Sequence, residues 1–124
     1  MKYFLDTSAI VEMVKGNPRY GQYLGARVIT CLLNLYELYF VLLREFSAPV
    51  AKEYFTRFRD FSVPIEDIHI FLAAELKRKH KGISYADALG YAMALSLGAK
   101  FLTGDGAFRT LEQVEFVKQV SSGK

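Results

Sequence analysis

Cysteine is almost absent from this 124-residue chain, and its single thiol, Cys31, rules out a disulfide within the chain. A lone reduced thiol is typical of reducing compartments, so we expect a cytoplasmic protein. No apolar run reaches the length of about 20 residues that crosses a membrane. The first residues also lack the charged-then-apolar layout of a signal peptide. The sequence therefore does not have the pattern of a disulfide-stapled or membrane-spanning protein.

Internal repeats, low-complexity segments and interdomain linkers are also missing from the sequence. The length predicts a single domain, which we place at 1–120, followed by a short tail at 121–124. Hydrophobic residues make up 52% of the chain and charged residues 23%, which is typical of a globular rather than a disordered protein. The net charge of +3 is compatible with a nucleic acid partner but does not identify one.

Short apolar segments alternate with helix-like segments along the chain. The strand patterns are 2–5, 27–31, 61–64, 100–103 and 114–117. Helical periodicity or helix-ending signals mark 7–16, 17–25, 34–46, 48–60, 65–82 and 84–98. This alternation predicts an α/β fold with a parallel sheet covered on both faces. Such sheets bind ligands at the carboxyl ends of their strands, near the point where the strand order reverses.

Four acidic side chains stand in apolar surroundings. Asp6 ends the first strand pattern, and Glu37 lies in the most hydrophobic helix of the chain. Asp87 lies in the first turn of the last predicted helix, and Asp105 follows the strand to which that helix leads. That helix is rich in small residues, which would let its backbone approach the sheet closely: Ala86, Ala88, Gly90, Ala92 and Ala94.

Each of these acids also has a purely structural interpretation. Asp6 alone is more typical of a helix N-cap than of a metal ligand. Glu37 could pair with Arg44 or be exposed, whereas a buried carboxylate there would need a partner or a metal ion. Asp87 suits the positive end of its helix. Asp105, between two glycines, is compatible with an ordinary turn.

Taken together, the four carboxylates predict a metal site. Several carboxylates cannot all ionise side by side without a cation, because their mutual repulsion raises their pKa values. Oxygen ligands suit Mg²⁺ or Mn²⁺ better than zinc. The two histidines, His69 and His80, are distant from the four acids in sequence, so no histidine or cysteine cluster points to another metal.

Four short motifs, in this order and at this spacing, resemble the PIN-domain ribonucleases, and in particular the VapC-type toxins of toxin–antitoxin pairs. They are "FLDTSAIV", "NLYELYF", "SYADALGYAMA" and "KFLTGDGAF", and the likeness extends over essentially the whole chain. The resemblance implies a three-layer α/β/α sandwich with a central parallel sheet. It also implies that the strands ending in Asp6 and Asp105 lie side by side.

The resemblance further assigns roles to individual residues. The acidic quartet of the family, implied to bind metal and to be catalytic, corresponds here to Asp6, Glu37, Asp87 and Asp105. Residues implied to orient a carboxylate or a water molecule are Thr103, Ser8, Thr7 and Asn34, the last standing where a serine or threonine is frequent. Ala107 occupies a place where many members carry a further acid, which leaves open whether one or two metal ions bind.

The activity implied by the resemblance is Mg²⁺- or Mn²⁺-dependent cleavage of RNA, single-stranded or structured. Members of the VapC type are commonly dimers that a small antitoxin protein silences. Basic residues must guide the RNA strand to such a site, and Arg44 and Arg109 lie nearest the acidic motifs in sequence. The basic run 77–81 is another candidate, although cations at a helix end also complement the helix dipole.

Two other functions are compatible with the same sequence. A PIN-like protein could bind RNA or a protein partner without cutting, and Ala107 leaves room for this alternative. A receiver-type phosphoacceptor domain has a similar length and an acidic Mg²⁺ site. Such domains need paired acids after the first strand, whereas Asp6 is followed by Thr7 and Ser8. The ordered motifs favour the ribonuclease.

Overall fold

The computed structural model describes residues 1–119, so the predicted domain end at 120 and the predicted tail at 121–124 lie outside the described residues. The strands are β1 (Lys2–Leu5), β2 (Arg27–Ile29), β3 (Lys100–Thr103) and β4 (Val114–Phe116). The α-helices are α1 (Thr7–Val14), α2 (Leu32–Glu45), α3 (Ala48–Arg59), α4 (Asp67–Lys79) and α5 (Tyr85–Ser96). Two short 3₁₀ helices are η1 (Pro18–Tyr23) and η2 (Gly106–Phe108). Within residues 1–119, no helix is long and apolar enough to cross a membrane.

The strands form one parallel sheet in the order β2-β1-β3-β4. From β1 the chain moves to β2 on one side and then returns across β1 to β3 on the other side. The strand order therefore reverses between β1 and β3, which pair directly with Phe4 opposite Phe101 and Leu5 opposite Leu102. This reversal leaves room beside the carboxyl ends of β1 and β3.

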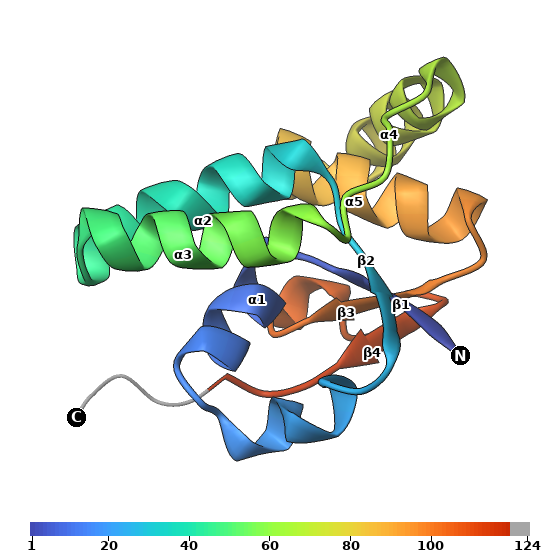
Figure 1. Cartoon of the computed structure of the whole chain (residues 1–124). Coiled ribbons are helices and arrows are strands. Elements are labelled where there is room, and N and C mark those ends of the chain that lie inside the picture. Colours follow the sequence, from blue (N-terminus) through green and yellow to red (C-terminus); the bar gives the residue numbers. More distant parts are fainter. Residues whose placement is uncertain (120–124) are drawn as a thin grey trace.

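Alternating side chains of β1 and β3 build a separate core on each face of the sheet. Leu5 and Leu102 pack with α1, α2 and α3 on one face, whereas Phe4 and Phe101 pack with α5 on the other. All four side chains are fully buried. Figure 1 shows α1, α2 and α3 grouped to the left of the strands and α5 to their upper right, with α4 projecting beyond α5. The three-layer α/β/α fold with a central parallel sheet is confirmed.

Helix α5 packs unusually close to the sheet, as its small residues predict. A Cβ atom added to Gly90 would lie 2.9 Å from Phe4 Cε1 and 3.2 Å from Phe101 Cε1. Glycine is therefore required here for close packing, because a larger side chain would displace the two phenyl rings. The close approach also fixes the position of the first turn of α5, where Asp87 lies.

Three sequence predictions need correction. The segment 61–64 is not a strand: Ser62 forms an isolated bridge with Thr30, and Pro64 has no N–H with which to extend it. The segment 17–25 is not an α-helix but contains the 3₁₀ turn η1, in which Pro18 occupies the first turn and Asn17 caps it. The helix predicted at 65–82 is shorter at both ends, since α4 spans Asp67–Lys79.

Candidate active site

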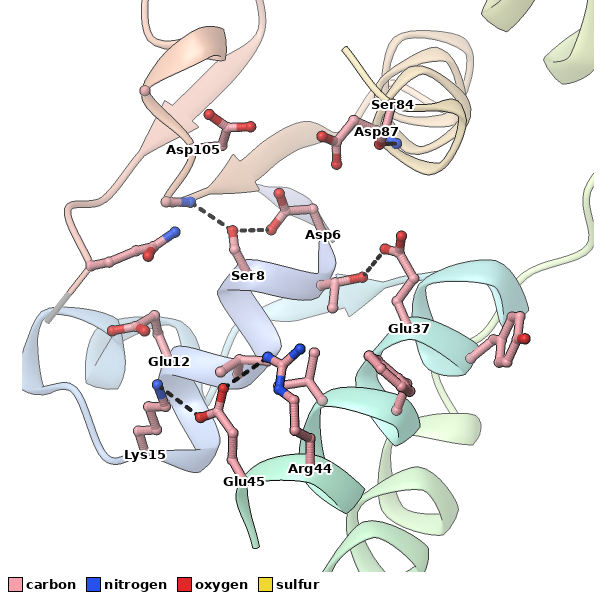
Figure 2. A pocket seen from close by; sticks show the side chains of 18 of the residues that line it. Asp6, Ser8, Glu12, Lys15, Glu37, Arg44, Glu45, Ser84, Asp87 and Asp105 are labelled. Carbon is pink, nitrogen blue, oxygen red and sulfur yellow. Dashed lines mark hydrogen bonds and ion pairs between the residues drawn. The ribbon is translucent and has the colours of Figure 1, made fainter. Parts of the chain in front are cut away.

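The four acids singled out in the sequence line one cavity of about 1130 Å³ at the reversal point of the sheet. Asp6 follows β1, Asp105 follows β3, Asp87 lies in the first turn of α5, and Glu37 lies on α2. Figure 2 shows Asp6, Asp87, Asp105 and Glu37 around the same part of this cavity. Residues that are up to 99 positions apart in the sequence are therefore brought together by the fold.

Asp6 is both the N-cap of α1 and a member of this acidic group. Its Oδ1 accepts a hydrogen bond from the backbone N–H of Ala9 (2.8 Å) and from the hydroxyl of Ser8 (2.7 Å). Its Oδ2 accepts a hydrogen bond from the hydroxyl of Thr103 at 2.5 Å. The side chain is only 1% exposed. The capping interpretation is therefore confirmed, and Asp6 also lines the cavity; its role as a metal ligand stays a prediction.

Ser8 and Thr103 also hold the loop that carries Asp105. The N–H of Gly104 donates to Ser8 Oγ (3.0 Å), and the N–H of Asp105 donates to Thr103 Oγ1 (3.0 Å). Each hydroxyl thus binds Asp6 on one side and the β3 loop on the other. These hydroxyls therefore hold the Asp6 carboxylate and the backbone of Asp105 relative to each other.

Glu37 is held by a chain of polar contacts rather than by Arg44. Its Oε1 accepts a hydrogen bond from the hydroxyl of Thr7 (2.8 Å). The side-chain amide of Asn34, which is fully buried, donates to the same Thr7 oxygen (3.2 Å) and accepts from the thiol of Cys31 (3.2 Å). Arg44 instead pairs with Glu45 at 3.1 Å. The predicted role of Thr7 and Asn34 beside a carboxylate therefore has a geometric basis.

Burial and mutual repulsion disfavour ionisation in this group. Burial raises the pKa of Asp6 to about 6, although the hydrogen bonds from Thr103, Ala9 and Ser8 lower it in part. The pKa of Asp87 is also raised to about 6, first by burial and then by the negative charge of Asp105, with a further contribution from Glu37. The four acids therefore repel one another across the cavity, which is the situation that a bound cation relieves.

The carboxylates do not form a closed metal cage in this conformation. Within residues 1–119, no three acidic, histidine or cysteine side chains stand close enough together to enclose an ion. The chemistry of the group nevertheless suits a divalent cation, because its side chains offer oxygen atoms alone and share one cavity. After burial, the negative charges of Asp105 and Glu37 also help to raise the pKa of Asp87.

The cavity continues beyond the acids along α1 and α2. At its far end, Figure 2 shows Arg44 with Glu45, Lys15 and Glu12. Arg44 thus lines the cavity, as expected of a residue that guides a charged ligand. Arg109 does not line it, and its guanidinium instead lies 6.0 Å from the ring centre of Phe116.

Sequence reasoning missed other residues that line the cavity. They include Tyr36, Phe40, Glu12, Lys15, Glu45, Lys118 and Gln119. For Tyr36 and Phe40 a signal existed, because both lie off the buried leucine stripe of α2 and flank Glu37 in the sequence. Gln119 had no such signal: it reaches the cavity because Asn17 and Tyr20 donate hydrogen bonds to the backbone of Lys118 and Val117.

Solved structures from toxin–antitoxin systems have a fold similar to that of this chain. A toxin–antitoxin complex from Klebsiella pneumoniae superposes with a TM-score of 0.77 at 16% identity, covering 95% of this chain and 99% of that one. VapC20 from Mycobacterium tuberculosis, described as a sarcin–ricin loop cleaving toxin, gives 0.75 at 21% identity, with 94% and 97% covered. VapBC2 from Rickettsia felis, bound to promoter DNA, gives 0.74 at 18% identity, with 97% and 100% covered.

At these identities the likeness shows the fold that this chain shares with VapC toxins. No curated sequence proved similar enough to count as a relative. A family model, by contrast, matches residues 3–114 and is described as the PIN domain; this range includes all four acids of the cavity, all of β3 and most of β1. The chain therefore belongs to the PIN domain family.

Proposed function

We propose that this protein is a metal-dependent endoribonuclease that hydrolyses phosphodiester bonds of RNA, and that it is the toxin of a toxin–antitoxin pair. The observation that carries the proposal is the meeting of Asp6, Glu37, Asp87 and Asp105 in one cavity at the reversal point of the sheet. Membership of the PIN domain family supports it. So does the likeness to VapC20, which is described as a sarcin–ricin loop cleaving toxin.

The four carboxylates would hold one or two divalent ions, Mg²⁺ or Mn²⁺. Such an ion supplies Lewis-acid activation of a water molecule and neutralises charge on the phosphate. The oxygen-only ligand set favours these hard cations. Ala107 is exposed and carries no ligand at the place where a further acid would extend the set, so the number of ions remains open in the proposal.

The protein's own side chains would divide the remaining work. Glu37, which accepts a hydrogen bond from Thr7, would accept a proton from the attacking water as well as bind metal. Ser8 and Thr103 keep Asp6 oriented and fix the loop of Asp105. Asn34 restrains Thr7 from the buried side.

Of the two arginines proposed to guide the RNA, only one lines the cavity. Arg44 lines the cavity on the side away from Asp105 and would contact the phosphate backbone there. Arg109 remains a candidate only for RNA that extends beyond the cavity, since it does not line it.

The proposed partners are a small antitoxin protein and a second copy of this chain, in the cytoplasm. Support for an antitoxin comes from the neighbours, one of which is described as a toxin–antitoxin complex and another as a member of the VapBC family of toxin–antitoxin systems. A homodimer rests on the family resemblance. Exposed apolar side chains on α4, among them Ile68, Ile70 and Phe71, are compatible with such contacts.

Cleavage of a panel of single-stranded RNAs tests the proposal. The native protein, Asp6→Asn and the control Asp60→Asn would be assayed with Mn²⁺, Mg²⁺ or EDTA. Asp60 is exposed and lies outside the cavity, so its variant should behave as the native protein does. We expect metal-dependent cutting by the native protein and the control, and its loss in Asp6→Asn.

The other outcomes of this assay favour the alternatives. RNA binding that is equal with and without metal, together with no cleavage, would favour a PIN-fold binding module without activity. Cleavage that persists in EDTA would contradict the metal-dependent mechanism. Membership of the PIN domain family disfavours the receiver-type phosphoacceptor, and labelling by a small phosphodonor would test it directly.

A further inference from the structure

Two exposed aromatic rings line the same cavity as the carboxylates. Tyr36 is 72% exposed and Phe40 is 57% exposed, although both lie on helix α2, whose leucine side chains form part of the core. They are four residues apart and therefore lie on one face of the helix, one turn after the other. Glu37, which lines the cavity with them, lies between them in the sequence.

The core of the protein does not use these rings. The buried stripe of α2 consists of Leu35, Leu38 and Leu42, each of which is fully buried. Tyr36 and Phe40 are left in a cavity whose other residues are largely polar or charged. Large aromatic rings held open to solvent beside charged groups are suited to a flat, partly charged ligand.

A cation continues the row of rings along α2. Arg44 is four residues beyond Phe40, and its guanidinium lies 5.5 Å from the centre of the Phe40 ring. Tyr36, Phe40 and Arg44 thus form one line on α2, two rings followed by a positive charge, and we call it the α2 ladder. Planar bases joined by phosphates are the ligand that this sequence of groups complements.

We infer that the α2 ladder is the binding surface for single-stranded RNA, with bases stacked on Tyr36 and Phe40 and a phosphate held by Arg44. The inference rests on the proposed ribonuclease function and specifies how that site holds its substrate. Stacking requires bases whose faces are free, so the ladder selects unpaired nucleotides over duplex. It tolerates different base sequences, because every base has a stacking face.

Fluorescence of 2-aminopurine measures the stacking directly. A short single-stranded RNA that contains this base would be titrated with protein in EDTA, so that no metal-dependent cleavage interferes. The variants are Tyr36→Ala and Phe40→Ala, with Tyr36→Phe and Phe40→Tyr as replacements that keep a ring. Phe46→Ala is the matched control, since Phe46 is 49% exposed at the end of α2 and does not line the cavity.

The expected result is quenching of 2-aminopurine by the native protein, by the two ring-keeping variants and by the control. Each alanine variant should bind roughly 10-fold more weakly or worse and quench less. Cleavage with Mn²⁺ should fall in the same alanine variants through a raised KM. The same binding pattern without any cleavage would support the ladder while contradicting the proposed nuclease.

Three results would overturn the inference. If the alanine variants bind and cleave as the native protein does, the ladder is wrong while the nuclease stands. If the native protein neither binds nor cleaves the RNA, both the ladder and the proposed function fail. If Tyr36→Ala or Phe40→Ala changes the sedimentation of the protein without RNA, the face belongs to a second copy of the chain.

Discussion

The hydroxyl of Thr103 at the end of β3 donates a 2.5 Å hydrogen bond to Oδ2 of Asp6 at the end of β1. This contact joins two neighbouring strands at their carboxyl ends, and both side chains are buried. The same Thr103 oxygen accepts the backbone N–H of Asp105. One hydroxyl therefore sets the distance between the two acids that follow the central strands.

Replacing Thr103 with valine should weaken the site without changing its shape. Thr103→Val removes the hydrogen bond to Asp6 and leaves the N–H of Asp105 without its acceptor. We expect RNA cleavage to fall roughly 10- to 100-fold, as is typical when a group that orients a metal ligand is lost. The pKa of Asp6 should rise further, because the lost bond favours its ionised form.

A pH–rate profile of Thr103→Val checks this prediction. Its acidic limb should move to higher pH than in the native protein. Thr56→Val, at an exposed position on α3, is the control and should leave both rate and profile unchanged. Native activity and an unshifted profile in Thr103→Val would contradict the positioning role.

Asp6→Asn should stabilise the metal-free protein at alkaline pH while removing its activity. The pKa of Asp6 is 3.8 in an exposed setting and about 6 in the fold, so the folded state binds the proton more tightly than the unfolded state. Folding stability therefore falls as the pH rises from about 4 to about 6 and stays lowered above that range. Asparagine carries no charge and escapes this penalty.

Thermal melts in EDTA at about pH 8 and about pH 4 measure the effect. We expect the free energy of unfolding of Asp6→Asn to be higher than that of the native protein by on the order of 1 kcal/mol at the higher pH. At the lower pH the two free energies should be equal. Asp60→Asn serves as the exposed control. An equal change at both pH values would mean that the burial of charge at Asp6 is not the cause.

Divalent metal should stabilise the native protein and displace protons from the site. Mn²⁺ at about 100 times its dissociation constant would add about 2.7 kcal/mol to the free energy of unfolding. Near pH 6, Asp6 and Asp87 are partly protonated, so binding must release protons there and release few near pH 8. Affinity should fall accordingly below about pH 6.

Calorimetry in buffers of different ionisation enthalpy counts these protons. The number of protons released per bound ion should be larger near pH 6 than near pH 8. Near pH 6 it should be smaller for Asp87→Asn than for the native protein. A thermal midpoint that millimolar Mn²⁺ leaves unchanged would argue against the carboxylate site altogether.

Gly90→Ala should destabilise the fold through overpacking. The added methyl group would lie 2.9 Å from the ring of Phe4 and 3.2 Å from that of Phe101, so α5 or the rings must move. The expected loss is about 1–3 kcal/mol of unfolding free energy in urea. Gly82→Ala is the control, since an added Cβ at Gly82 has no neighbour within 4 Å among the described residues. Equal stability of the two variants would contradict the close packing of α5.

The sequence predicted best those features that depend on neighbouring residues, such as the strands and the acids that follow them. The apolar segments at 2–5 and 100–103 are the central strands β1 and β3, and the stop after each one marks an acid of the cavity. The small residues of α5 correctly indicated close packing against the sheet. The prediction of a strand at 61–64 was wrong, because only Ser62 pairs with another segment. A strand needs a partner over several residues, and a short apolar pattern does not show whether one exists.

The sequence by itself determined the alternation of strands and helices, the places where carboxylates follow strands, and the absence of a disulfide, because these depend on residue type and local spacing. Only the tertiary structure decided which side chains meet. The pairing of β1 with β3 brings Thr103 to Asp6, and the seating of α2 brings Thr7 to Glu37. Such contacts depend on strand order and helix packing, which link positions far apart in the chain and leave no local pattern at either one.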